Sequence, residues 1–194
     1  HQSLQIIMQR HEALRANFSE VAGTPVQFVE EKPELPLPLV DLKHLPPEAQ
    51  QEEVQRLANS EAQRPFNLHN DPLLRTTLLC LKPNEHILLL TVHHIAFDGW
   101  STGIFVQELL ALYPALVDGR SPDLPPLAIQ YADYAQWQQQ QLIEGYFDPH
   151  IAYWEKQLGD TPPILELPTD KPRPPVQAHH GAQHHFSLEP ALYD

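Results

Sequence analysis

Apolar side chains recur along the first quarter of the chain in patterns that separate helical from extended segments. Over residues 3–18 they return at helical spacing, which predicts an amphipathic helix. Gly23 and Pro25 end this pattern, and apolar and polar residues then alternate over residues 26–31, which predicts a short strand. Prolines crowd residues 32–49, which indicates an extended connection.

Two further patterns fill the middle of the chain. Pro46 and Pro47 suit the start of a helix, where a missing N–H breaks no hydrogen bond, and the helical spacing continues to about Gln63. Two runs, residues 73–81 and 86–94, are apolar on both faces and are joined by the sequence KPNE. They predict a β-hairpin in the middle of a sheet.

Helices are expected in most of the second half. Ser101 can cap a helix whose apolar residues share one face as far as Leu116, and Pro114 predicts a kink or an early end near Tyr113. After a long loop, two further helices are predicted over residues 131–144 and 149–158.

The last two helices and the tail carry more specific expectations. Tyr131, Tyr134 and Trp137 follow one another at core spacing on the first of these helices, which predicts that they pack inside. Residues 162–177 indicate an extended crossover, and the alternation over residues 179–190 predicts a strand.

Composition and charge narrow the class of protein. The chain has 194 residues, enough for one domain or one lobe of a larger one, and it starts at His1, so we expect an excerpt of a longer chain. A net charge of −13 argues against a nucleic-acid partner. The longest apolar run, residues 87–92, is too short to span a bilayer. Cys80 is the single cysteine, which predicts a buried thiol in a reducing cytosol.

The sequence VHHIAFDGWS, Val92 to Ser101, holds the candidate chemistry. Because side chains alternate along a strand, His93 and His94 should face opposite sides of the sheet, one toward the core and one toward a cleft. Asp98 and Gly99 fit a tight turn into a helix, whose first amides could receive developing negative charge. The residues alone allow three readings: structural histidines, a metal half-site, or a catalytic imidazole.

Four other strings occur with this one in a fixed order. The five are RHEALRANF (residues 10–18), VHHIAFDGWS (92–101), YADYAQWQ (131–138), YWEKQL (153–158) and LELPTDKPRP (165–174). The ordered set resembles the condensation domains of nonribosomal peptide synthetases. These domains belong to the chloramphenicol acetyltransferase-like superfamily, whose mark is His-His-x-x-x-Asp-Gly.

The resemblance implies a fold and a domain organisation. Such a domain is a pseudo-dimer of two lobes with the active site in a tunnel between them. The implied fold class is α/β (an α+β sandwich): one chloramphenicol acetyltransferase-like lobe, a mixed sheet covered by helices. Residues 1–175 would be the N-terminal lobe, truncated at its start, and residues 176–194 the crossover and first strand of the missing C-terminal lobe. The fragment alone is therefore expected to be inactive.

The resemblance also implies an activity. In this family the amine of a carrier-bound aminoacyl group attacks an acyl or peptidyl thioester on an upstream carrier, and an amide bond forms. His94 would face the tunnel, as a general base or as a group that positions the amine, and His93 would be its buried partner. Asp98 would pair with an arginine, either Arg10 or Arg15.

The remaining residues of the string would support this site. Gly99 would keep the backbone open beside the reacting amine. Trp100 and Ser101 would contribute packing and a helix cap.

The implied partners are the upstream and downstream peptidyl carrier domains, an adjacent adenylation domain and the C-terminal lobe. The domain itself would bind no cofactor and no metal, and the 4'-phosphopantetheine arms would come from the carriers. A cytoplasmic location without membrane or nucleic acid is expected.

Three alternatives remain at this point. They are an ester-forming acyltransferase, a non-catalytic carrier-docking module, and a metal-binding protein. The last would use histidines such as His179, His180, His184 and His185. An epimerization domain is disfavoured because Gly99 follows Asp98.

Overall fold

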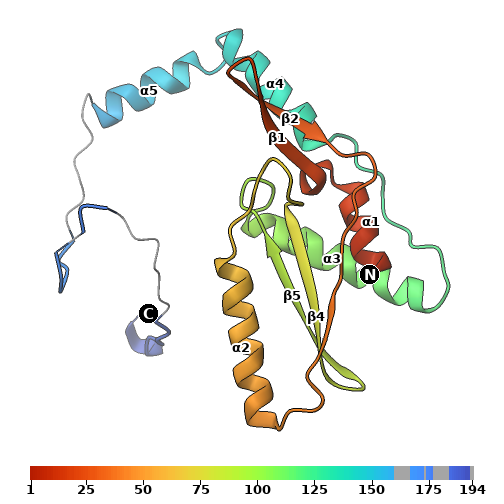
Figure 1. The fold of residues 1–194 in the computed structure, drawn as a ribbon. Coiled ribbons are helices and arrows are strands. Elements are labelled where there is room, and N and C mark those ends of the chain that lie inside the picture. Colours follow the sequence, from red (N-terminus) through yellow and green to blue (C-terminus); the bar gives the residue numbers. More distant parts are fainter. Residues whose placement is uncertain (160–166, 173, 177–183, 193–194) are drawn as a thin grey trace. The chain divides into compact units, whose positions relative to one another are not determined.

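The computed structural model describes residues 1–159, 167–172, 174–176 and 184–192 (Figure 1). By its internal contacts the chain divides into two compact units, His1–Tyr146 and Phe147–Asp194, and each is described by itself.

The first unit begins with a short helix and a β-hairpin. Helix α1 (Gln2–Arg10) is followed by the 3-10 turn η1 (Glu12–Arg15). Strands β1 (Ala16–Val21) and β2 (Thr24–Val29) then pair antiparallel across a turn at Ala22 and Gly23, both with positive φ.

The helix predicted over residues 3–18 is therefore wrong beyond Arg10. The residues that follow η1 find a partner strand in β2, and helical spacing within one segment cannot reveal such a partner. The strand predicted over residues 26–31 is confirmed, with bounds Thr24–Val29.

A three-stranded mixed sheet forms the centre of this unit. Strand β3 (Leu39–Asp41) pairs parallel with β4 (Leu74–Lys82), and β4 pairs antiparallel with β5 (Glu85–Val92). The predicted hairpin is confirmed, but only β4 is central, because β5 lies at the edge of the sheet in the described chain. β3 was not predicted, since it falls within the Pro-rich connection.

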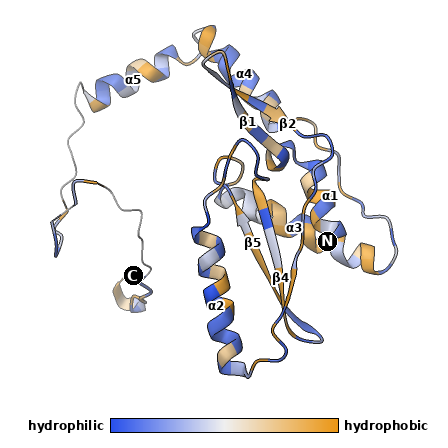
Figure 2. Ribbon diagram, viewed as in Figure 1, coloured by the Kyte–Doolittle hydropathy of each residue, from blue (hydrophilic) through white to orange (hydrophobic). Residues whose placement is uncertain are grey.

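Helices cover the two faces of this sheet, in keeping with the fold class that the resemblance implied. On one face, α1 and α3 (Gly99–Val117) bury a common core, which includes Leu4, Ile7, Met8, Leu14, Leu35, Leu74, Phe105 and Leu112. Arg75, next to Leu74, points to the opposite face and donates hydrogen bonds to carbonyls at the end of α2 (Pro47–Gln63). Figure 2 shows that hydrophilic residues predominate along α2, in keeping with its exposed outer side.

Helix α3 differs from its prediction at both ends. Asp98, not Ser101, is its N-cap residue, and the helix continues past Pro114 to Val117, so the early end near Tyr113 is wrong. A proline in the last turn removes one backbone hydrogen bond, while Leu112 and Ala115 on either side of it are buried. α3 is long and apolar enough to cross a membrane by length and composition alone, but it carries the buried Glu108 and packs against α1.

Helix α4 (Tyr131–Ile143) completes the first unit and confirms its prediction. Its aromatic residues are not core residues, however. Tyr131, Tyr134 and Trp137 are exposed and pack on one another, with ring centroids 6.0 and 5.7 Å apart. Spacing on one helix does not reveal whether another element covers that face.

The second unit contains helix α5 (Asp148–Leu158), which was predicted, and the short turn η2 (Pro190–Leu192). The structure describes only the second part of the strand predicted over residues 179–190. Residues 184–189 do not form a strand, and residues 179–183 lie outside the described part of the chain.

Candidate active site

The loop between β5 and α3, residues 93–98, carries the two adjacent histidines. Its first four residues form a turn in which the Ala96 N–H donates to the His93 carbonyl oxygen at 3.1 Å. His94 and Ile95 occupy the corner of this turn, and both are exposed. The two imidazoles thus enter different environments just beyond the end of the strand.

His93 anchors one end of the loop. It is half-buried rather than buried, and its ring meets Phe66 edge to face at 5.3 Å. Its backbone N–H donates to the Leu73 carbonyl at 2.9 Å, and the Ile95 N–H donates to its Nδ1 at 3.0 Å. Because Nδ1 accepts this bond, the neutral ring carries its proton on Nε2.

Arg75 supports this anchor through Phe66. Its guanidinium lies 3.8 Å from the centre of that ring and donates to the carbonyls of Glu61, Arg64 and Pro65. Its Nε also lies 2.5 Å from the Glu61 carboxylate, with which it forms an ion pair. A charged pair on the α2 side of the sheet thereby holds the ring against which His93 packs.

Phe97 anchors the other end of the loop, with its ring 6.0 Å from that of Phe105 on α3. Between the two anchors, His94 lines a cavity of about 150 Å³. The cavity is lined by Ala13, His94, Ile95, Ala96, Phe97, Asp98, Ser101 and Tyr131. His94 is thus accessible to a small group bound there.

Asp98 caps α3, and no arginine among the described residues pairs with it, so the predicted contact with Arg10 or Arg15 is wrong. Its Oδ1 accepts hydrogen bonds from the Ser101 N–H at 2.8 Å and from the Ser101 hydroxyl at 2.7 Å, and Ser101 Oγ lies 3.3 Å from the Asp98 N–H. These bonds, with the Ser101 hydroxyl first, lower the pKa of Asp98, and the charge of His94 adds a smaller effect. Ser101, three residues away in the sequence, satisfies the carboxylate locally, so no arginine is needed to hold it.

The same hydrogen bonds decide whether the Ser101 amide at the start of α3 is free to bind a negatively charged group. The Ser101 amide, one of the first N–H groups of the helix, is already bound to the Asp98 carboxylate. The expectation that these amides receive developing charge is therefore wrong for Ser101.

The two arginines have other partners. Arg10 Nε donates to Glu108 Oε1 at 2.8 Å, and its terminal nitrogen donates to the Pro125 carbonyl. Arg15 donates to the Glu30 carbonyl at 2.6 Å and lies 3.4 Å from Glu12. Both arginines hold the framework of the lobe around the loop.

Glu108 is a structural residue that the sequence did not single out. It lies in the middle of α3, is 7% exposed, and also contacts His11 Nε2 at 2.9 Å. Through Arg10 and His11 it joins the end of α1 to α3. One acidic residue between the apolar positions of a helix was the signal that could have revealed it.

Gly99 and Trp100 begin α3. A side chain added at Gly99 would meet nothing within 4 Å, so this side of the loop is open in the described chain. Trp100 is 83% exposed, so the packing predicted for it is not found among the described residues. Ser101 contributes to the cap as predicted, but as the third residue of the helix.

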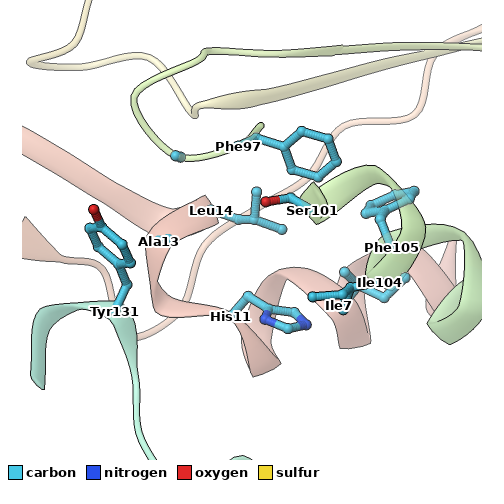
Figure 3. Close-up of a pocket in the computed structure, with 10 residues that line it drawn as sticks. Ile7, His11, Ala13, Leu14, Phe97, Ser101, Ile104, Phe105 and Tyr131 are labelled. Atoms are coloured by element: carbon cyan, nitrogen blue, oxygen red, sulfur yellow. The ribbon is translucent and has the colours of Figure 1, made fainter. Parts of the chain in front are cut away.

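A second cavity, of about 160 Å³, adjoins the first and was not foreseen (Figure 3). It is lined by Ile7, His11, Ala13, Leu14, Ala96, Phe97, Ser101, Ile104, Phe105 and Tyr131. The two cavities share five lining residues, namely Ala13, Ala96, Phe97, Ser101 and Tyr131.

A metal site was one reading of the histidines. Within residues 1–159, 167–172, 174–176 and 184–192, no three His, Cys, Asp or Glu side chains come together as a metal ion would require. His179 and His180 lie outside the described residues, so the role of the histidine cluster stays a prediction.

A mixed sheet covered by helices, with His-His-x-x-x-Asp-Gly between strand and helix, defines a condensation-type lobe. The profile described as Condensation domain matches residues 1–194. This chain belongs to the condensation domain family, and the predicted resemblance and fold class are confirmed.

The chain is similar to short parts of large synthetases, among them a nonribosomal peptide synthase. It is 46% identical over 191 residues to a subunit of linear gramicidin synthase from Brevibacillus parabrevis, across 98% of this chain and 4% of that one. The chain therefore spans a small part of this relative.

Solved structures agree with this assignment. The X-domain from teicoplanin biosynthesis is 32% identical, with a TM-score of 0.73 over 89% of this chain and 38% of that chain. A condensation domain that mediates chain release from the enacyloxin polyketide synthase is 31% identical, with a TM-score of 0.68 over 83% of this chain and 31% of that chain.

Proposed function

We propose that this chain supplies His94 to a condensation reaction between two carrier-bound substrates in nonribosomal peptide synthesis. Condensation domains are in general acyltransferases that form amide bonds, and the chain belongs to that family. The finer proposal is that the amine of an aminoacyl group on a downstream carrier attacks an acyl or peptidyl thioester on an upstream carrier.

One observation carries this proposal: His94 is exposed at the corner of an anchored turn and lines a cavity, whereas His93 is held by Phe66 and Ile95. An imidazole that is exposed on a cavity wall can meet a substrate nitrogen. The contacts of His93 and Phe97 hold the two ends of its loop, which favours productive geometry.

The chemistry suits such a group. A free α-amine has an ordinary pKa of about 7.7–8.0, so a useful fraction is uncharged at neutral pH. Its nitrogen bonds to the thioester carbonyl carbon, the C–S bond then breaks, and the thiolate leaves on the upstream arm. The nitrogen must lose a proton in this sequence, and His94 can accept it and pass it to the thiolate. General base catalysis of this kind contributes about 10²–10⁴-fold.

His94 can also act by hydrogen bonding alone, so that the amine is held in line with the thioester. Tethering of both substrates to carriers then supplies most of the acceleration through high local concentration. We favour a residue that positions the amine and also accepts its proton.

The proposal requires partners beyond this chain. They are the upstream and downstream carrier domains with their 4'-phosphopantetheine arms, an adjacent adenylation domain, and the C-terminal lobe that completes the tunnel. Without that lobe we expect the 194-residue chain to be inactive. We place the protein in the cytoplasm.

The test is a reconstitution with the complete domain, one acyl-loaded carrier and one aminoacyl-loaded carrier. Mass spectrometry of the downstream carrier should show the elongated product in an amide linkage. Product that fails to form with any loaded pair would contradict the proposal.

A second candidate is acyl transfer to a hydroxyl acceptor, which would make an ester. The likeness to a domain that mediates chain release from a polyketide synthase favours it. The same reconstitution with a hydroxyl acceptor distinguishes the two, because mild alkali cleaves a newly formed ester bond but not a newly formed amide bond, whereas it cleaves a carrier thioester in either case. Carrier binding without turnover would instead support a docking module.

A further inference from the structure

The second cavity lies directly beside the cavity that His94 lines. Its walls come from four parts of the lobe: α1, η1, the histidine loop with α3, and the first residue of α4 (Figure 3). It shares Ala13, Ala96 and Phe97 with the cavity of His94, so a molecule bound beside His94 lies next to it.

The cavity is suited to an apolar group. Its volume of about 160 Å³ is close to that of an engineered cavity of about 150 Å³ that binds benzene. Ile7, Ile104 and Phe105 supply aliphatic and aromatic walls. A single branched or aromatic side chain fits a space of this size.

Two of the polar side chains that line it, His11 and Ser101, already have hydrogen-bond partners. His11 Nε2 is bound to Glu108 at 2.9 Å, and the Ser101 hydroxyl donates to Asp98 at 2.7 Å. A charged guest would therefore lose its water without gaining a partner from these residues, which is costly.

We propose that this cavity receives the side chain of the aminoacyl acceptor and selects apolar over charged acceptors. The inference rests on the proposed function, in which His94 contacts the acceptor amine. The carbon bonded to that amine also carries the side chain, so of the two substrates the acceptor is the one whose side chain starts next to His94. Ile104 is then a specificity-determining residue, since it lines this cavity and not that of His94.

The test uses the complete condensation domain with carriers loaded synthetically with glycyl, leucyl, aspartyl or tryptophanyl groups, so that adenylation selectivity plays no part. The wild type should use the leucyl acceptor about tenfold or more better, in kcat/KM, than the aspartyl acceptor. Ile104→Trp, which fills the cavity, should lower leucyl turnover about tenfold relative to glycyl turnover. Ile104→Ala, which enlarges it, should raise tryptophanyl relative to leucyl turnover.

Val106→Trp is the matched control, because Val106 is on the same helix, is 45% exposed against 43% for Ile104, and does not line the cavity. It should leave all ratios between acceptors unchanged. The inference is overturned if neither Ile104 variant changes these ratios, or if Val106→Trp changes them equally. If the inference is overturned but the wild type still turns over the glycyl acceptor, the proposed function stands. A wild type that turns over no acceptor contradicts the proposed function itself.

Discussion

The contact of Glu108 with Arg10 and His11 offers a quantitative test of how the lobe is held together. Glu108→Gln keeps the size of the side chain but removes its charge. The Glu108 side chain is 9% exposed, and those of Arg10 and His11 are 16% and 25% exposed. Removal of one partner from a fully buried ion pair costs about 3–5 kcal/mol, and the partial exposure of Arg10 favours the lower end, about 3 kcal/mol.

The expected loss can be measured by thermal and urea unfolding of the 194-residue chain, followed by circular dichroism. For a domain of this size, about 1 kcal/mol corresponds to about 2–4 °C, so the midpoint should fall by about 6–12 °C. Glu52→Gln, a change of the same kind at an exposed position on α2, should alter stability by less than about 0.5 kcal/mol.

A double-mutant cycle separates the ion pair from other effects. Arg10→Met and Glu108→Met should each destabilise the lobe, because each leaves the other charge with a lost partner. The loss of unfolding free energy in the double variant should be smaller than the sum of the losses in the two single variants by about 1–3 kcal/mol. The reason is that the double variant leaves neither charge of the Arg10–Glu108 pair without its partner. Strictly additive costs, or a Glu108→Gln variant as stable as wild type, would refute the reasoning.

Two further predictions concern the anchors of the histidine loop. Asp98 has a lowered pKa because Ser101 donates to its charged form, so its stabilising effect is present above the ordinary aspartate pKa and is lost as the pH falls through the lowered value. The acid limb of unfolding midpoint against pH should therefore flatten in Asp98→Asn, and an unchanged limb would argue against the cap. Arg75→Lys removes the stack on Phe66 and three carbonyl hydrogen bonds, and should cost about 2 kcal/mol. Hydrogen exchange at the His93 amide should be faster in Arg75→Lys than in the wild type. Equal protection of this amide in both proteins would show that Arg75 does not support the loop.

Much of the fold was readable from local patterns. The apolar runs that became β4 and β5, and the helices α2, α4 and α5, form where the periodicity placed them. Strand β1 was missed because its partner β2 and its contact with the Leu68 carbonyl lie elsewhere in the sequence. The edge position of β5 was missed because the apolar composition of a strand does not indicate how many other strands pair with it.

The site was predicted in part for similar reasons. Their adjacency at the end of a strand predicts different environments for His93 and His94, and in the structure His93 is half-buried whereas His94 is exposed. The arginine partner of Asp98 was transferred from the family resemblance, whereas the local sequence, with Ser101 three residues on, already allowed a capping box. The second cavity could not be foreseen, because its walls come from segments as far apart as Ile7 and Tyr131.

The central claim is that the His94 imidazole acts on the acceptor amine. Single-turnover condensation by the complete domain with loaded carriers, compared between wild type and His94→Ala, tests it most directly. His86→Ala, an exposed histidine on β5, serves as the control and should react at the wild-type rate. The account predicts a loss of about 10²-fold or more for His94→Ala with the fold intact. A folded His94→Ala domain that condenses as fast as wild type would contradict it.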